Sequence, residues 1–382
     1  MKFPVYLDYN ATTPLDPEVL TSMLPYLSEV YGNPSSPHGI GQRAKAALDE
    51  HREKLAKLWG CESHEIIFTS GGTESNSLAI IGGALAAKGK GKHLVTTAIE
   101  HSSVLRPIRW LEDHLGFSST IVNTDTYGFV SPESIAQALR KDTVLVSVGA
   151  ANNEVGTIQP LSQITEVVHD RGILFHTDAT QLLGKAPVFN ISLTGADLVS
   201  CCAHKLFGPK GVGALYVRSP LRLQPLITGG TQEKELRAGT ENLAAIVGLV
   251  VAMEKNMQPP RFDQSFLAPL SKHLKDVITR IPGVRFWGPN APYRLTNTLA
   301  FSVDGTNSQT LLAALDLAGI CASAGSACTA GMLKPSHVLL ALGATPQEAS
   351  SLIRFSLGPT TTPEEIEYTA NVFAQVVHQV RN

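Results

Sequence analysis

Two side chains of this sequence combine nucleophilic chemistry with unusual surroundings. Lys205 stands in CCAHKLFGPKGVG, where it is expected to end a strand ahead of a glycine-rich turn. A lysine that enters a core is costly unless it is paired or deprotonated, and a lysine with a lowered pKa can form a Schiff base. Cys328 stands in SAGSACTAG among small residues, which leave a thiol accessible and the backbone free to move. A surface lysine and a buried structural thiol remain the alternatives.

Two further segments place polar groups where predicted strands end. FHTDATQ puts Asp178 at a strand end beside His176 and Gln181. This carboxylate could hold a cationic nitrogen of a ligand, although capping of the next helix is favoured from the residues alone. SGGTES (70–75) follows another predicted strand and opens a helix, so its glycines and first-turn amides suit an anion. A plain capped turn is the commoner outcome for such a segment.

The composition of the 382 residues excludes several classes of protein. Hydrophobic residues make up 43% and charged residues 17%, and 31 Lys and Arg nearly balance 33 Asp and Glu. This is ordinary globular composition without the basic excess that nucleic-acid binding requires. No run of 18 apolar residues predicts a membrane span, and the N-terminus does not resemble a signal peptide. The five cysteines lack a C-x-x-C pair, which argues against disulfides or a zinc site and predicts a reducing, cytoplasmic location.

Short β-rich runs alternate with helical patterns through the first two thirds of the chain. Such alternation predicts an α/β fold with a mostly parallel sheet covered by helices, and ligands of such sheets bind beyond the carboxyl ends of the strands. The helix expected at 239–255 is apolar on all sides and therefore predicted to be buried. The predicted strands are 65–71, 93–101, 143–154, 172–178, 197–204 and 211–217, and the predicted helices between them are 73–87, 102–115 and 161–172.

A polar, proline-marked joint at 256–264 separates this region from a different pattern. Beyond it the sequence predicts a smaller α+β domain. We expect a large domain over 15–258 and a small domain made of 1–14 and 259–382. The helices predicted in the second part are 263–281, 307–318, 335–343 and 363–380.

The chain resembles the pyridoxal-phosphate-dependent cysteine desulfurases of the NifS and IscS type, within the class-V aminotransferases, over nearly its whole length. The resemblance implies a fold-type I transferase with a seven-stranded sheet. One such motif would be weak evidence, but many in the expected order are strong evidence. The segments that carry it are YLDYNATTP, YGNPSSPHG, TSGGTESN, EHSSV, NNEVGTIQP, HTDATQ, AHKLFGPKGVG, RAGTEN, GSACTAG and IRFSLG.

The resemblance implies a role for each residue that would surround the cofactor ring. The lysine matching Lys205 binds pyridoxal 5'-phosphate covalently, and the aspartate matching Asp178 pairs with the pyridinium nitrogen. The histidine matching His101 stacks over the ring and takes part in proton transfer. Gln181 resembles the partner of the phenolic oxygen.

The resemblance also implies how the phosphate is held. Gly72, Thr73 and His204 match phosphate contacts. Cys202 stands where relatives often have serine, and a thiol is a poorer hydrogen-bond donor than a hydroxyl. Thr240 resembles the residue that reaches the phosphate of the other subunit, so a homodimer is implied.

For the substrate, L-cysteine, the resemblance implies that Arg354 clamps the carboxylate and that Asn153 contacts substrate and cofactor. Without the resemblance, a strand-end arginine in a surface ion pair would be favoured for Arg354. Lys205 would remove the Cα proton, and Cys328 would take the sulfur as a persulfide for an acceptor or scaffold protein. No metal site is predicted, although a transient role of Cys328 as an iron–sulfur ligand stays open. Cys321 is expected to be a buried strand residue.

Three other functions remain open at this stage. A selenocysteine lyase or an aminotransferase could use the same scaffold, and neither would require Cys328. A cofactor-bearing regulatory protein is the third, but the chain has no added DNA-binding region and no basic patch.

Overall fold

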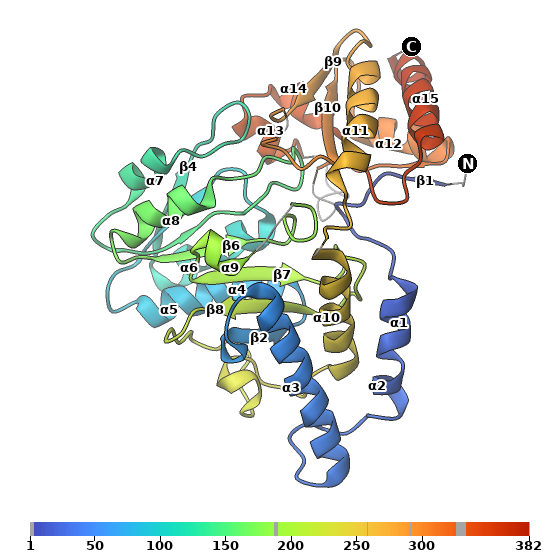
Figure 1. Cartoon of the computed structure of the whole chain (residues 1–382). Coiled ribbons are helices and arrows are strands. Elements are labelled where there is room, and N and C mark those ends of the chain that lie inside the picture. Colours follow the sequence, from blue (N-terminus) through green and yellow to red (C-terminus); the bar gives the residue numbers. More distant parts are fainter. Residues whose placement is uncertain (1–3, 187–189, 258, 291, 326–333, 382) are drawn as a thin grey trace.

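A seven-stranded sheet runs through the middle of the molecule (Figure 1). The computed structural model describes residues 4–186, 190–257, 259–290, 292–325 and 334–381. The strand order is β2-β8-β7-β6-β5-β3-β4, with β8 antiparallel to its two neighbours and the other pairs parallel, so the predicted α/β sheet is confirmed. The strands are β2 (Ile66–Thr69), β3 (His93–Thr97), β4 (Ser118–Val122), β5 (Thr143–Ser147), β6 (Leu174–Asp178), β7 (Leu198–Cys202) and β8 (Gly213–Val217).

Helices cover both faces of this sheet. Successive side chains of a strand point to opposite faces, and accordingly Ile66 and Phe68 join one hydrophobic core while Ile67 joins the other. The first core is closed by α3 (Gly39–Trp59), α7 (Pro132–Ala138), α8 (Leu161–His169), α9 (Ile191–Thr194) and α10 (Leu243–Met257). The second is covered by the π-helical turn η2 (Leu78–Gly82), α5 (Gly83–Ala87) and α6 (Ser102–Leu115), and α4 (Gly72–Ser77) leads from β2 into η2.

The predicted helices of this region are found, with shifted ends. The helix expected at 239–255 is buried, as predicted, but α10 begins only at Leu243. Gly239 has φ +103°, which a helix cannot accommodate, and the side chain of Asn242 accepts a hydrogen bond from the Ala245 amide, as a helix cap does.

Strand β4 was not among the strands predicted from the sequence. Its residues, SSTIV, are mostly half-buried because β4 pairs only with β3 at the edge of the sheet. An edge strand does not need the continuous apolar run that marks a central strand. The N-terminal helices were not predicted either; they are α1 (Pro17–Met23), α2 (Pro25–Ser28) and α3.

A smaller antiparallel sheet with its own core follows (Figure 1). Its order is β12-β10-β9, formed by β9 (Val284–Trp287), β10 (Thr298–Val303) and β12 (Ile353–Ser356). A parallel pair, β1 (Val5–Tyr6) with β11 (Ile320–Cys321), brings the N-terminal segment to it. The helices close to the predicted ones are α11 (Gln264–Ile278), α12 (Ser308–Leu317), α13 (His337–Ala341) and α15 (Pro363–Arg381), and α14 (Pro346–Ser350) was not predicted. The two-domain limits stay a prediction, and residue 258 lies outside the described residues.

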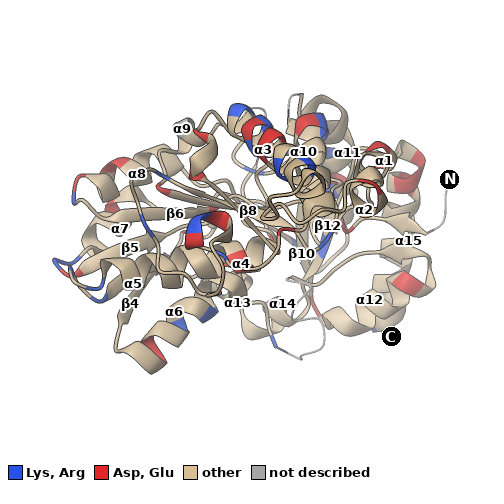
Figure 2. Cartoon of the chain, turned by 90° about the horizontal axis from the view of Figure 1, so that it is seen from below, with Lys and Arg blue, Asp and Glu red and all other residues tan. Residues whose placement is uncertain are grey.

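The charged residues of both signs are spread over the covering helices rather than gathered on one face (Figure 2). Within the described part of the chain, no helix has the length and apolar character needed to cross a membrane.

Candidate active site

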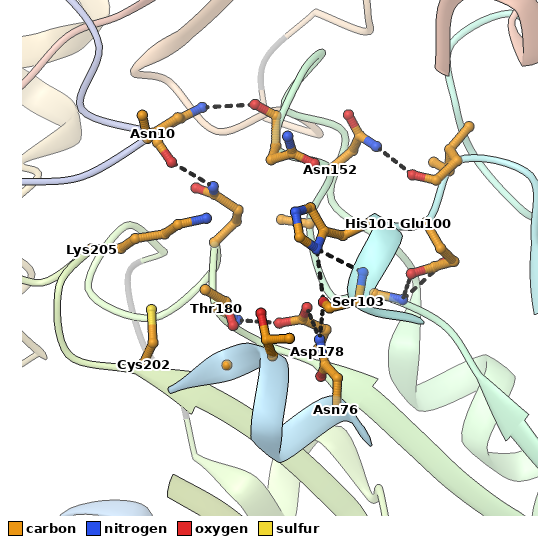
Figure 3. A pocket seen from close by; sticks show the side chains of 18 of the residues that line it. Asn10, Asn76, Glu100, His101, Ser103, Asn152, Asp178, Thr180, Cys202 and Lys205 are labelled. Atoms are coloured by element: carbon orange, nitrogen blue, oxygen red, sulfur yellow. Dashed lines mark hydrogen bonds between the residues drawn. The ribbon is translucent and has the colours of Figure 1, made fainter. Parts of the chain in front are cut away.

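A cavity lies where the parallel strands β3, β5, β6 and β7 reach their carboxyl ends (Figure 3). Asp178 ends β6 and Cys202 ends β7, while His101 follows β3 and Asn153 follows β5. Parallel strands bring their carboxyl ends to one edge of a sheet, so residues far apart in sequence meet here. The predicted site residues that line this cavity are Gly72, Thr73, His101, Asn153, Asp178, Gln181, Cys202, His204, Lys205 and Arg354.

Of the two other predicted site residues, one is described and lies outside this cavity, and the other is not described. Thr240 is exposed, lies between η3 (Gln232–Glu235) and α10, and is not among the residues that line the cavity. Cys328 lies outside the described residues.

Asp178 is held as a carboxylate at the floor of the cavity. Its Oδ1 accepts a hydrogen bond from the Thr180 amide at 2.9 Å, and its Oδ2 accepts one from Asn76 Nδ2 at 2.7 Å. Burial raises the pKa of Asp178, but hydrogen bonds from Thr180 and Asn76 outweigh this, and the pKa lies below its ordinary value. The capping of a following helix that the residues alone favoured is not found, because residues 180–185 form turns; Asp178 instead holds this turn and presents negative charge to a ligand. His176, in contrast, contacts Ser147 and Ser200 inside the sheet.

His101 presents one ring nitrogen to the cavity. It caps α6, and its Nδ1 accepts a hydrogen bond from the Ser103 amide at 3.1 Å, which fixes Nδ1 as an acceptor. Burial lowers the pKa of His101, and the positive charge of Lys205 lowers it further. A neutral ring with Nδ1 as acceptor carries its proton on Nε2, so His101 can donate a hydrogen bond to a ligand. Figure 3 shows it facing Lys205 across the cavity.

Lys205 does not end a strand, as the sequence had suggested. Strand β7 stops at Cys202, and Lys205 lies in the turn that follows. The N-terminal segment holds this turn: the amide and the hydroxyl of Thr13 both donate to the His204 carbonyl, and the Phe207 amide donates to Thr13 Oγ1. Phe207 has φ +62°, a conformation that costs energy for a large side chain, and these contacts compensate for it. The turn thus directs Lys205 into the cavity.

Other residues predicted to contact the phosphate, His204, Gly72 and Cys202, lie around the turn that carries Lys205. Burial together with Lys205 and Lys210 lowers the pKa of His204 to about 4, so its ring is neutral near pH 7. A Cβ added to Gly72 would lie 3.1 Å from Thr180 Oγ1, a tight contact that would require the Thr180 side chain to move slightly. Burial raises the pKa of Cys202 to about 11, which keeps its thiol protonated.

Arg354 is a buried arginine rather than a surface one. Its side chain is 1% exposed within β12, and Nη2 donates to Asp8 Oδ1 at 2.7 Å. Nη1 donates to the carbonyl oxygens of Asn153 and Gly325 at 3.0 and 2.9 Å. The Nε atom is buried and has no hydrogen-bond partner among the described residues. Arg354 therefore brings an oriented positive charge and an uncommitted donor to the cavity wall.

Several residues of the cavity were inside the quoted motifs but received no role from the sequence. Asn76 of TSGGTESN joins Asp178 to Ser103, because its Nδ2 lies within hydrogen-bond distance of both. Asn10 of YLDYNATTP is buried, and its carbonyl accepts a hydrogen bond from Gln181 Nε2 at 3.0 Å. The feature of the sequence that could have identified such site residues is a polar residue inside a motif that lies beside a predicted strand end.

The cysteine prediction holds in part. Cys321 lies in β11 as expected, but its side chain is half-buried rather than buried. Burial raises the pKa of Cys61 to about 12 and also raises the pKa of Cys201 and Cys321.

The cavity has the groups that an anionic, aromatic aldehyde would require. Lys205 offers an amine, Asp178 offers a carboxylate for a cationic ring nitrogen, and Arg354 and Lys205 supply positive charge. Asn76 Oδ1 is buried there without a hydrogen-bond partner among the described residues.

Comparisons with known proteins agree on one family. The sequence profile of the class-V aminotransferases matches residues 5–369. The chain is 46% identical to the cysteine desulfurase IscS of Dictyoglomus turgidum over 382 residues, covering 100% of this chain and 96% of that relative. It is 42% identical to the cysteine desulfurase IscS of Methanosarcina thermophila over 378 residues, covering 99% and 93% of the two chains.

Solved structures show the same likeness. A NifS-like protein superposes with a TM-score of 0.91 at 36% identity, covering 98% of this chain and 100% of that one. SspA, solved in complex with cysteine, superposes with a TM-score of 0.81 at 36% identity, covering 94% and 99%.

Proposed function

We propose that this chain is a cysteine desulfurase, because it belongs to the class-V aminotransferase family and, within it, to the cysteine desulfurases of the IscS and NifS type. It would convert L-cysteine to L-alanine and retain the sulfur on Cys328 as a persulfide. The observation that carries the proposal is the meeting of Lys205, Asp178, His101 and Arg354 around one cavity.

Pyridoxal 5'-phosphate fits the residues of this cavity. Lys205 would bind the aldehyde, Asp178 would hold the ring nitrogen, and Gln181 would donate to the ring oxygen. The phosphate would lie near the described residues Gly72, Thr73, Cys202 and His204. When bound, the cofactor supplies an electron sink for the bond changes at the substrate Cα.

The chain's own residues would orient the substrate and move its protons. Arg354 and Asn153 would bind the carboxylate of L-cysteine, since the Arg354 charge lies at the cavity wall. Lys205 would take the Cα proton as a general base once its amine is free. His101, with its proton on Nε2, would donate to a developing negative charge.

Cys328 is proposed as the sulfur acceptor, partly by elimination. The four described cysteines have raised pKa values and would be protonated at neutral pH, whereas only a thiolate attacks sulfur. The Cys328 sulfur would form a bond to the substrate sulfur as the substrate C–S bond breaks. Alanine keeps the carbon skeleton, and the thiol becomes a persulfide, so the step needs no added oxidant or reductant.

Assembly and delivery complete the proposal. Thr240 is exposed at the end of a loop, which suits a residue that reaches the phosphate site of a second subunit in a homodimer. The persulfide would pass to an acceptor or scaffold protein, for iron–sulfur cluster assembly or for other sulfur-containing cofactors. The proposed location is the cytoplasm.

The test compares wild type with Cys328→Ala, using Cys321→Ala as the matched control. Wild type with L-cysteine and a reductant should release alanine and sulfide, and mass spectrometry should find one added sulfur on the peptide that contains residue 328. Cys321→Ala should behave as wild type, and Lys205→Ala should lose the yellow colour of the bound cofactor. Full cysteine turnover by Cys328→Ala would overturn the persulfide mechanism, and turnover of selenocysteine alone would identify a lyase instead.

A further inference from the structure

Lys185 is a buried lysine behind the cavity that the proposed mechanism leaves without a role. It is 2% exposed, and its Nζ donates to Gln181 Oε1 at 2.7 Å and to Asn10 Oδ1 at 2.8 Å. Both acceptors are neutral amide oxygens. The ring of Phe262 lies 5.3 Å from Nζ.

Burying Lys185 in this way lowers the free energy of unfolding, so stability alone does not explain the arrangement. Burying a lysine amine against neutral acceptors only is unfavourable whether the amine stays charged or gives up its proton, and an apolar side chain of similar size would avoid that cost. Burial lowers the pKa of Lys185 well below its ordinary value, and the charges of Lys205 and Arg354 lower it further. Either protonation state has enough N–H groups to make both hydrogen bonds.

The contacts of Lys185 determine which way the Gln181 amide faces. Oε1 accepts from Lys185, while Nε2 donates to the Asn10 carbonyl at 3.0 Å. Turning the amide by 180° would place its oxygen against the Asn10 carbonyl oxygen, a repulsive contact, and would take Oε1 away from the Lys185 donor. One N–H of Nε2 is committed to Asn10, and the second is available to a ligand in the cavity that Gln181 lines.

Asn10 would keep its position without Lys185, whereas Gln181 would keep only the hydrogen bond from its Nε2 to the Asn10 carbonyl. The Asn10 amide donates to Ser356 Oγ at 2.9 Å, its Nδ2 donates to Thr298 Oγ1 at 2.8 Å, and its Oδ1 accepts from Asn297 Nδ2 at 3.1 Å. Gln181 Oε1 would lose its donor, which is one of the two contacts that orient the amide. The effect of removing Lys185 should therefore reach the cavity through Gln181.

We propose that Lys185 is a positioning residue that holds the Gln181 amide with its N–H toward the anionic ring oxygen of the bound cofactor. The proposal rests on the proposed function, since it takes pyridoxal 5'-phosphate as the ligand. It adds a residue outside the cavity wall to the machinery that binds the ring.

The experiment measures pyridoxal 5'-phosphate affinity and the cofactor absorbance band for wild type, Lys185→Met, Gln181→Ala and the double variant. Lys185→Met should weaken affinity about tenfold or more, which is the loss of one hydrogen bond to a charged oxygen, and should shift the band. In the Gln181→Ala background the same change should have little further effect. Lys275→Met is the matched control, because Lys275 also donates to an amide oxygen and faces an aromatic ring, but far from the cavity.

The outcomes separate this inference from the proposed function. If wild type does not bind pyridoxal 5'-phosphate, the proposed function fails. If wild type binds it and Lys185→Met matches Lys275→Met in affinity and spectrum, the inference is wrong. An equal loss of affinity with and without Gln181 would also overturn it. Lys185→Gln, which keeps an N–H donor, serves if Lys185→Met does not fold; its affinity should lie nearer to wild type than that of Gln181→Ala, and an affinity no better than Gln181→Ala would contradict the proposal.

Discussion

Glu100 should make the stability of this protein depend on pH, in the direction opposite to most carboxylates. It immediately precedes His101, is 5% exposed, and accepts hydrogen bonds from Thr97 Oγ1 at 2.7 Å and from the Gly149 amide at 3.0 Å. Burial raises the pKa of Glu100 from 4.5 to about 7, and the nearby charge of Asp178 adds to this, while the two hydrogen bonds oppose it.

The sign and the magnitude follow from these two values. In the folded protein Glu100 keeps its proton until about pH 7, whereas in the unfolded chain it loses the proton near pH 4.5. Between these values unfolding releases a proton, so stability falls as pH rises. The stabilisation is fully present below pH 4.5 and is lost as pH rises through about 7. The difference corresponds to about 3 kcal/mol.

The perturbation that isolates this effect is Glu100→Gln, which keeps the shape and an acceptor oxygen but cannot ionise. We expect the free energy of unfolding of Glu100→Gln, relative to wild type, to increase by about 3 kcal/mol between pH 5 and pH 8.5. Urea unfolding at several pH values measures it, and Glu133→Gln on the exposed first turn of α7 controls for the substitution itself. A difference between Glu100→Gln and wild type that is constant with pH would refute the reasoning.

Three other predictions follow from the cavity. Asp8→Asn removes the charge that faces buried Arg354 and should lower the free energy of unfolding by about 2 kcal/mol; Asp49→Asn, in an exposed pair, should cost less than about 0.5 kcal/mol, and equal losses in urea unfolding would contradict the difference. Asp178→Asn should keep the fold and lower kcat/KM for L-cysteine by about 100-fold or more, and unchanged kinetics would exclude the electron-sink role. Cys202→Ser should tighten pyridoxal 5'-phosphate binding about two- to fivefold because a hydroxyl is the better donor, whereas weaker binding in equilibrium dialysis would show that no such contact exists.

The sequence predicted the central strands and failed at the edge of the sheet for a physical reason. Strands β5 and β7 are buried on both faces, so every residue is apolar or small, and the pattern is visible locally. Strand β4 is covered less, and its first three residues are serine or threonine, so no apolar run marks it. Asp178 was then placed correctly at the end of its strand, because the end of an apolar run also marks the edge of the cavity, whereas the strand predicted at 197–204 ends earlier, at Cys202.

The contacts that hold the site could not be predicted, since they join residues far apart in the chain. Asn10 contacts Ser356 and Gln181, and Asp8 contacts Arg354. No local pattern in YLDYNATTP shows that this segment pairs with β12. The pairing depends on how the chain connects the two sheets. The resemblance to a family identified the segment, but it assigned no partner to either residue.

The same long-range contacts give the cavity of this chain, whose net charge is −2, basic groups beside the carboxylate of Asp178. Lys205 and Arg354 line it and Lys185 lies behind it, while Glu100 keeps its proton up to about pH 7. Lys205 contributes to the lowered pKa of both His101 and His204, so these rings respond to the same positive potential. A ligand with a phosphate, a ring oxygen and a carboxylate would compensate this potential. Binding should therefore raise the pKa of His101, because added negative charge favours its protonated form.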